Sequence, residues 1–396
     1  MEIFHDIIRQ ESYLRQSLQN DKKPLGMLIG AGAPMAIRVN IDGDDCPLIP
    51  DIAGMTKTIC VKLKSGPLSS YFDLVYSHLI EDGIKDLNIE QILSYIRSLL
   101  QVAGNGEVRG LKSSELADLD VAICKIIVEI VNKEMPDARS PYHKIAAWIR
   151  TILRTCPVEL FTTNYDLLME QALEEFRIPY FDGFVGSRMT FFDPSAIEED
   201  KLPARWARLW KLHGSINWLH DEKGQVYRRF STENADRTVI YPSHLKYDQS
   251  RKMPYLAMID RLKAFIKLPS AMLITSGYSF KDQHLNETIL QALQASSTSI
   301  VFALMYGKLE EYPEAFSLAQ KSPNLSLLAL DGAIIGTKQA PWNTCIDDNQ
   351  EESISLKRVA GSTTGLFDAN FKLGDFDSLG NFFEDIIGEE RGRVSE

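Results

Sequence analysis

The sequence predicts an α/β fold, a Rossmann-like and mostly parallel sheet with helices on both faces, together with a helical insertion and a C-terminal extension. Short continuous apolar runs, typical of strands buried on both faces, recur along the chain. Segments with helical periodicity alternate with these runs. Glycine or polar residues follow several runs, at the positions where parallel strands present ligand-binding groups.

The N-terminal part is expected to contain one strand and several helices. A helix is expected over residues 3–19, and a strand ending in glycine over residues 25–30. Residues 37–66 are rich in Gly, Pro and Asp, so we expect a long loop there that could cover a ligand. Asn88 and Gln91 form a candidate capping box for one helix. Helices are expected over residues 67–80, 89–100, 115–133 and 142–154.

The C-terminal part alternates strands and helices more regularly. Strands are expected over residues 158–162, 207–213, 271–276, 299–305 and 325–329. Helices are expected over residues 166–177, 256–268 and 283–294. A hairpin through residues 217–230 is expected to turn near Lys223-Gly224. Beyond about residue 335 the chain is polar and acidic until a helical pattern at residues 379–387.

These patterns predict three units. Residues 1–66 and 136–335 are expected to form the Rossmann-like domain, with residues 67–135 inserted as a helical block. Residues 336–396 are expected to form a C-terminal extension that could serve oligomerisation or a partner.

The composition is that of an ordinary globular protein, with 44% hydrophobic and 24% charged residues. No apolar run is long enough to span a membrane, and the N-terminus has no signal pattern. The five cysteines contain no Cys-x-x-Cys pair, which argues against structural zinc and favours a reducing, cytoplasmic setting. The net charge of −11 disfavours direct binding of nucleic acid.

One stretch, residues 201–230, is locally basic. It predicts either a solvated hairpin face or a patch that meets a polyanion, a phosphate or an acidic partner. Its basic residues are Lys201, Arg205, Arg208, Lys211, Lys223, Arg228 and Arg229.

Gly30, Ala31 and Gly32 lie at the end of the first expected strand, where a helix is expected to begin. Glycine there would let the main chain approach a pyrophosphate, which the N-terminus of a helix favours. The full G-x-G-x-x-G pattern is absent because Met35 occupies its third glycine position. An ordinary strand-to-helix turn is therefore the alternative.

Thr162, Thr163, Asn164 and Asp166 follow a second strand and precede a helix. Asparagine is a neutral donor and acceptor, so it can orient a sugar hydroxyl or a water; an Asx-turn is the alternative for Asn164. Asp166 could cap the helix or hold the cofactor side of the loop.

His213 follows a third strand, and it is a candidate base because histidine titrates near neutrality. Gly277 and Ser279 follow a further strand and are a second candidate phosphate-binding or ribose-binding pair. An ordinary turn with Asp282 as helix cap is the alternative for that segment.

Taken in order, Gly30-Ala31-Gly32, Phe161-Thr162-Thr163-Asn164-Tyr165-Asp166 and Leu212-His213-Gly214-Ser215 resemble the sirtuin family, in its bacterial NAD-cleaving branch. Pro34 replaces a usual serine, and Ile49-Pro50-Asp51 resembles a cofactor-loop motif placed farther from the glycines than in deacetylases. The resemblance implies Asn164 and His213 as catalytic residues. It implies NAD binding by Gly30, Ala31, Gly32, Asp51, Thr162, Thr163, Asp166, Gly277 and Ser279.

The same resemblance implies a function. It suggests an NAD hydrolase with NAD as substrate and no metal, acting as an antiphage effector. The resemblance also implies a homo-oligomer that is paired with a HerA-type ATPase. DNA would then be contacted only indirectly, through the ATPase. Two alternatives remain open: a non-catalytic NAD or ADP-ribose sensor or scaffold, and a protein deacylase, for which the zinc cysteines are missing.

Overall fold

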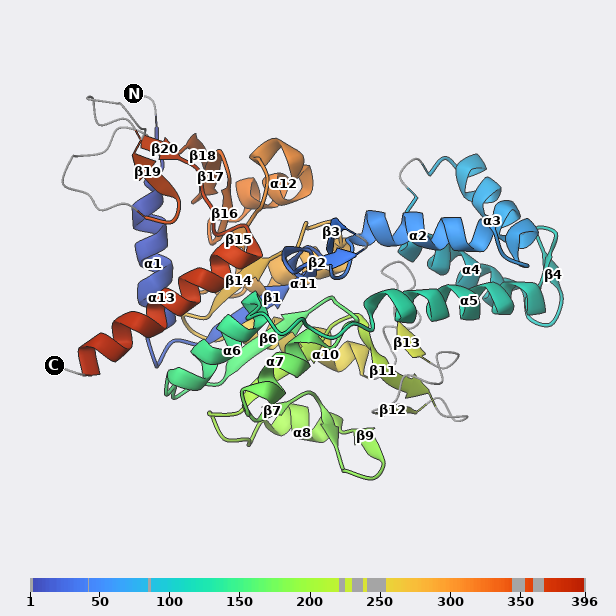
Figure 1. Cartoon of the computed structure of the whole chain (residues 1–396), viewed down its shortest axis with the longest axis horizontal. Coiled ribbons are helices and arrows are strands. Elements are labelled where there is room, and N and C mark those ends of the chain that lie inside the picture. Colours follow the sequence, from blue (N-terminus) through green and yellow to red (C-terminus); the bar gives the residue numbers. More distant parts are fainter. Residues whose placement is uncertain are drawn as a thin grey trace.

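The computed structural model describes residues 3–41, 43–84, 87–220, 225–229, 238–240, 254–343, 353–358 and 367–394. A nine-stranded sheet lies at its centre, and Figure 1 shows the helices arranged around it. The strand order is β18 (Lys338–Pro341), β17 (Gly332–Ile335), β16 (Leu325–Ala329), β15 (Ile300–Leu304), β14 (Met272–Ser276), β1 (Leu25–Ile29), β6 (Val158–Thr162), β10 (Ala207–Lys211) and β7 (Tyr180–Phe181).

The sheet has the order of a doubly wound fold. From β16 to β7 all neighbours are parallel, and the pairs β16–β17 and β17–β18 are antiparallel. From β1 the chain adds β6 and β10 on one side, then returns to add β14, β15 and β16 on the other. This reversal places a topological switch point between β1 and β14, the place where open α/β sheets bind ligands. The predicted α/β class, with a mostly parallel Rossmann-like sheet, is confirmed.

Apolar side chains cover both faces of the sheet. Met27 and Ile29 of β1 join one core cluster, whereas Leu28 between them joins the other. This alternation follows from the two-residue period of a strand. The first cluster receives α1 (Ile7–Gln19), α6 (Pro141–Thr151), α7 (Leu168–Glu175) and α13 (Phe376–Val394). The second receives α10 (Tyr255–Ile266), α11 (Gln283–Gln294) and α12 (Pro313–Lys321).

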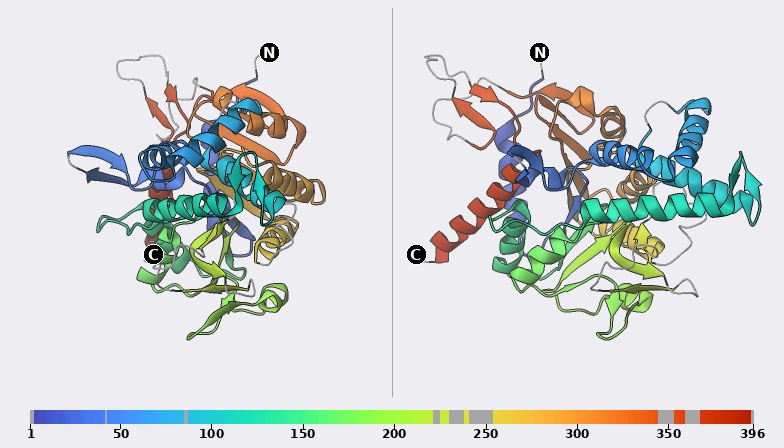
Figure 2. Two further views of the ribbon diagram at one scale, coloured as in Figure 1. Left: turned by 90° about the vertical axis from the view of Figure 1, so that its right-hand side faces the viewer. Right: turned by 45° about the vertical axis from the view of Figure 1, so that its right-hand side comes forward.

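A helical layer projects from the sheet at the end opposite α13 (Figures 1 and 2). Its helices, here called the helical layer throughout, are α2 (Ile52–Lys64), α3 (Ser69–Glu81), α4 (Ile89–Ala103) and α5 (Ser113–Val131). They pack on one another with buried apolar stripes. The predicted capping box of α4 is confirmed, since Asn88 and Gln91 exchange side-chain and backbone hydrogen bonds.

The expectation of a long loop over residues 37–66 is wrong. The segment holds a short hairpin, β2 (Arg38–Ile41) with β3 (Asp44–Pro47), and then the whole of α2. Met55, Ile59 and Leu63 recur at helical spacing and are buried, so the periodic signal was present. Proline and glycine lie just before α2 and in its first turn, where a helix tolerates them. Their presence favoured the prediction of a loop over that of a helix.

A second, antiparallel sheet follows β10. Its strands are β13 (Thr238–Ile240), β11 (Gly214–His220), β12 (Val226–Arg228), β9 (Thr190–Phe192) and β8 (Phe184–Val185). The predicted hairpin is present as the antiparallel pair β11–β12, and its expected turn at Lys223-Gly224 lies outside the described residues.

In the described part of the basic stretch, three of the cations form ion pairs with acidic residues instead of joining one solvated face or patch. Arg208 is 1% exposed and pairs with Asp200 at 2.8 Å. Lys211 is 2% exposed and pairs with a glutamate of α7. Arg228 pairs with Asp182. Because burying a lone cation is costly, each of these side chains takes an acidic partner from a neighbouring segment.

The C-terminal part packs onto the sheet domain. β18 lies beyond residue 335 but forms the edge strand of the main sheet, so the boundary expected there falls inside the β17–β18 hairpin. α13 lies against α6, where Phe383 contacts Trp148 with ring centroids 4.8 Å apart. A small hairpin, β19 (Leu356–Arg358) with β20 (Phe367–Ala369), precedes it. Across the described ranges, none of the helices combines the length and apolar character needed to span a bilayer.

Candidate functional site

Four of the predicted site segments, those after β1, β6, β10 and β14, lie at the carboxyl edge of the main sheet. In the strand register Ile29 pairs with both Thr162 and Ser276, and Thr162 pairs in turn with Lys211. The strands β14, β1, β6 and β10 therefore end at one level. The polar or glycine-rich segments that follow them emerge side by side, because parallel strands present their carboxyl ends at the same edge.

Asn164 is held over the end of β1. Its backbone N–H donates to the Thr162 hydroxyl at 3.0 Å, and its side-chain Nδ2 donates to the Gly30 carbonyl at 3.1 Å. The Thr162 hydroxyl in turn donates to the Ile29 carbonyl at 2.9 Å. Asn164 is only 8% exposed. Asn164 thereby connects the segment after β6 to the glycine turn, and the Thr162 hydroxyl links the two backbones.

His213 forms a pair with Asp282. The His213 Nε2 lies 3.0 Å from the Asp282 Oδ2, and both side chains are under 10% exposed. The other oxygen, Oδ1, accepts from the backbone N–H groups at the start of α11. The pair joins the segment after β10 to the start of α11, which follows β14, although β6 and β1 lie between these two strands in the sheet. A carboxylate in this position orients an imidazole and stabilises its protonated form.

The segments that carry Asn164 and His213 run alongside each other. Each residue lies two positions beyond the matched pair Thr162 and Lys211. The Leu212 N–H donates to the Thr162 carbonyl at 2.8 Å, and the Ile216 N–H donates to the Tyr165 carbonyl at 3.1 Å. The two side chains therefore occupy equivalent places on neighbouring strand extensions.

The glycine turn is closed onto the end of β14. The Gly30 N–H donates to the Ser276 carbonyl and the Gly32 N–H to the Gly277 carbonyl, both at 2.9 Å. Only a short 3-10 helix, η1 (Ala33–Ala36), follows. The expected α-helix N-terminus for a pyrophosphate is therefore replaced at this turn by a single 3-10 turn.

This contact explains why both turns use glycine. A methyl group on Gly30 would overlap the Gly277 carbonyl, and Gly277 itself has φ +67° and lies against the backbone of Gly32 and Ala33. Gly30 and Gly277 therefore allow the backbone after β1 and the backbone after β14 to pack directly on each other at the switch point.

The Gly30→Ala variant is expected to lose about 1–3 kcal/mol of unfolding free energy, since its methyl group has nowhere to go except into backbone. Denaturant unfolding measures this. The matched control is Gly388→Ala in α13, where an added methyl group meets nothing within 4 Å and stability should stay level or rise slightly. Equal stability of both variants would contradict the close packing.

Asp166 and Lys211 form a buried charged group beneath Asn164. Asp166 accepts from the Leu168 N–H at 3.0 Å, but the N-cap residue of α7 is Leu167, so Asp166 lies one position before the cap that it was expected to form. Burial raises its pKa to about 6, while the nearby Lys211 ammonium opposes the rise. Lys211 donates to the Asp166 carbonyl and to Glu170 Oε1, the latter at 3.0 Å. The group fixes the backbone immediately after Asn164.

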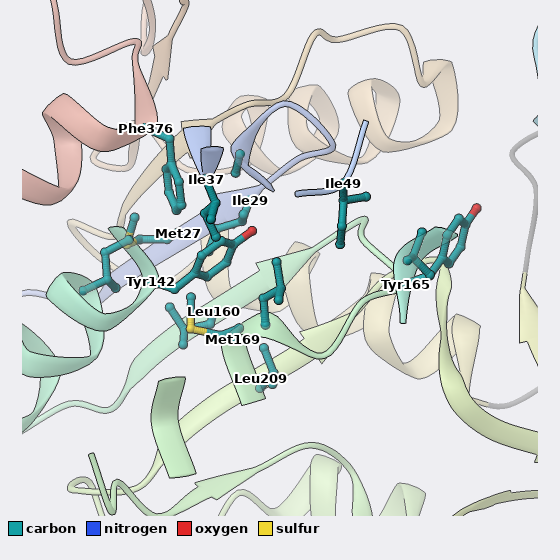
Figure 3. Close-up of a cluster of buried hydrophobic side chains, with 14 of the residues drawn as sticks. Met27, Ile29, Ile37, Ile49, Tyr142, Leu160, Tyr165, Met169, Leu209 and Phe376 are labelled. Atoms are coloured by element: carbon teal, nitrogen blue, oxygen red, sulfur yellow. The ribbon is translucent and has the colours of Figure 1, made fainter. Parts of the chain in front are cut away.

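Tyr142, on α6, was not identified from the sequence. Figure 3 shows its ring beside Ile29 and Ile37, near the end of β1. Burial and the Asp166 charge raise the pKa of Tyr142 well above its usual value, and the nearby Asn164 carboxamide lowers it. Within the described residues the hydroxyl makes no hydrogen bond of regular geometry. No sequence signal distinguished this tyrosine from a core residue.

The remaining predicted residues cap a helix, bond through the backbone or are partly exposed. Asp51 is the N-cap of α2, accepting from the Gly54 N–H at 2.8 Å, and the Thr163 N–H donates to the Ile29 carbonyl. Ala31 and Ser279 are partly exposed. A cavity of about 650 Å³ lies elsewhere, between α1 and strands β15 to β17, and includes none of the predicted site residues. Among the described residues, no group of three or more His, Cys, Asp or Glu side chains is placed to hold a metal ion.

Sheet order and site together define the class: a doubly wound α/β protein with an asparagine and a histidine–aspartate pair at the carboxyl edge. Residues 158–327, somewhat under half of the chain, match the family model of the SIR2-like domain. A solved structure described as "Structural Basis for the Mechanism and Regulation of Sir2 Enzymes" is similar over 100% of both chains, at 14% identity and a TM-score of 0.40. No curated protein sequence matches the chain.

Proposed function

We propose that this protein hydrolyses NAD at the bond between nicotinamide and ribose, releasing nicotinamide and ADP-ribose. The observation that carries the proposal is the arrangement of Asn164 and the His213–Asp282 pair on adjacent strand extensions. Both elements lie within the segment that matches the SIR2-like domain, a match that supports NAD-dependent chemistry in general. They lie beside the switch point, where dinucleotides bind in doubly wound sheets.

The roles of the side chains follow from their chemistry. Nicotinamide leaves with the electron pair of the glycosidic bond and becomes neutral, so the ribose carbon develops oxocarbenium character. Asn164 would orient a ribose hydroxyl or the attacking water without placing a negative charge beside the substrate. With Nε2–H directed at Asp282, the imidazole of His213 accepts a proton through Nδ1. Water adds to the ribose carbon, and its proton passes to His213.

The geometry also favours exclusion of bulk water. Asn164 and His213 are 8% and 5% exposed. A reactive sugar cation needs a fixed ribose and a single admitted water, which an open surface would not provide. The Asn164 amide and the glycine amides are already bonded within the protein, so these donors would contact a substrate only by exchanging those hydrogen bonds.

We further propose that NAD cleavage depletes the cofactor as an antiphage effector activity, leading to abortive infection in the cytoplasm. A homo-oligomer paired with a HerA-type ATPase would control it, and DNA would be engaged through the ATPase. The support is the sequence resemblance, together with the net charge of −11, which disfavours direct DNA binding. A C-terminal helix packed on the sheet domain offers a surface for oligomer or partner contacts.

The test is a chromatographic time course of purified protein with NAD, alone and with a co-expressed HerA-type ATPase. We expect equal amounts of nicotinamide and ADP-ribose without any acylated peptide, released slowly by the protein alone and faster with the partner. Nicotinamide release only when an acylated peptide is added would instead indicate deacylation. Equal, high rates in both conditions would contradict gating. Nucleotide binding without turnover in any condition would indicate a sensor or scaffold.

A further inference from the structure

Tyr165 stands between Asn164 and Asp166 in the sequence, yet its side chain serves a different part of the molecule. Its hydroxyl donates to Glu90 Oε1 of α4 at 3.0 Å. The residue is 7% exposed. Figure 3 shows Tyr165 set apart from the other labelled side chains, with its hydroxyl pointing away from them. The segment of the candidate catalytic asparagine is therefore bonded directly to the helical layer.

The backbone of Tyr165 faces the opposite way. Its carbonyl accepts from the Ile216 N–H at 3.1 Å and from the Ser215 hydroxyl at 3.5 Å. One residue thus joins three segments: α4 through its side chain, the strand that follows His213 through its carbonyl, and Asn164 through the peptide bond. A shift of the ring that displaces the Tyr165 Cα would be carried into the adjoining peptide, because a trans peptide unit moves as a plane.

The partner of Tyr165 is held firmly. Glu90 lies in the first turn of α4, next to the Asn88 capping box. The adjoining Ile89 N–H donates to the Thr56 hydroxyl of α2 at 2.9 Å. Farther along α4, Arg97 pairs with Asp120 of α5 at 2.7 Å. The acceptor of the Tyr165 hydroxyl is therefore fixed by contacts between three helices of the layer.

The Tyr165 hydroxyl remains a donor. Burial raises its pKa well above the ordinary value, and the Glu90 carboxylate raises it further. A hydrogen bond from a neutral hydroxyl to a carboxylate is stronger than one between neutral groups.

We propose that Tyr165 is a positioning residue, through which Glu90 and the helical layer hold the Asn164 carboxamide in its reactive place. The inference rests on the proposed NAD cleavage and assigns control of that reaction to the helical layer. A partner that moves the layer would then change turnover without touching the substrate.

The variants separate this role from simple loss of packing. Tyr165→Phe keeps the ring and removes the hydroxyl, and Glu90→Ala removes the acceptor. We expect either change to lower kcat for nicotinamide release about tenfold with KM nearly unchanged, as expected when a displaced group serves the transition state. Glu90→Gln keeps an acceptor and should restore most of the rate. Tyr95→Phe is the matched control. Tyr95 lies on α4, as Glu90 does, and its hydroxyl accepts from Arg109 at 2.6 Å rather than contacting the segment of Asn164.

Hydrogen–deuterium exchange gives a second readout that does not need turnover. Glu90→Ala should raise exchange in peptides covering residues 158–168, and Tyr95→Phe should leave it unchanged. A Tyr165→Phe protein with the kcat and exchange of wild type would overturn the positioning role. Wild-type protein that releases no nicotinamide would overturn the proposed reaction, and the exchange comparison would still decide whether the helical layer holds the asparagine.

Discussion

Alanine in place of Asn164 should lower kcat for nicotinamide release from NAD by about 10²–10³, the usual cost of removing one transition-state contact. The carboxamide is buried over the end of β1 and donates a hydrogen bond to the Gly30 carbonyl, whereas the backbone N–H bond to Thr162 is kept in the variant, so only the side-chain contact is removed. KM should change little, because the contact that is removed is assigned to the transition state rather than to binding of the dinucleotide. Single-turnover assays with purified protein measure the effect.

The control for this variant is Asn324→Ala. Asn324 also uses its carboxamide structurally, donating to the carbonyls of Leu293 and Ser296 at 3.1 and 3.0 Å. It lies just before β16, at the amino edge of the sheet, away from the site. Its loss should lower stability and leave kcat of the folded protein intact. An Asn164→Ala protein that is folded and releases nicotinamide at the wild-type rate would rule out the catalytic assignment.

Removal of the imidazole in His213→Ala should lower kcat by about 10²–10⁴, the range for loss of a general base. Asp282→Asn should give a smaller loss, because asparagine still caps α11 but carries no charge to stabilise a protonated imidazole. The double variant should be no slower than His213→Ala, since residues that act as a unit are not additive. Steady-state nicotinamide release across the three proteins measures this.

His5→Ala supplies the matched histidine control. The His5 ring contacts the Lys338 carbonyl and Trp342 beside the edge strand β18, five strands away from β1 in the sheet. Its removal should leave the rate unchanged. Additive losses in Asp282→Asn and His213→Ala would show that the aspartate acts only as a helix cap.

Much of the fold could be predicted because local patterns decide it. The runs that became β6 and β16 are apolar on both faces and short, and their predicted bounds match the structure. Helix α4 was marked by its apolar stripe and its capping box. The segment that became α2 was missed because its helical period begins among proline and glycine, whose local signal is a loop.

The candidate site was likewise predictable only in part. Asn164 and His213 could be selected because a polar residue at the end of a buried strand, in a parallel sheet, must reach the ligand edge. Asp282 was read only as a cap, since nothing local connects it to a histidine 69 residues away. The glycine turn was expected to bind a pyrophosphate, whereas its amides donate hydrogen bonds to the end of β14 and the residue after it.

By itself, the sequence determined where strands and helices form and which polar residues stand at strand ends, because periodicity and capping act over a few residues. Only the tertiary structure decided which of those ends meet. The pairing of His213 with Asp282, the bond from Tyr165 to the helical layer and the packing of Gly30 on Gly277 all depend on strand order and register. Those are set by burial across the whole sheet, where residues distant in the chain become neighbours.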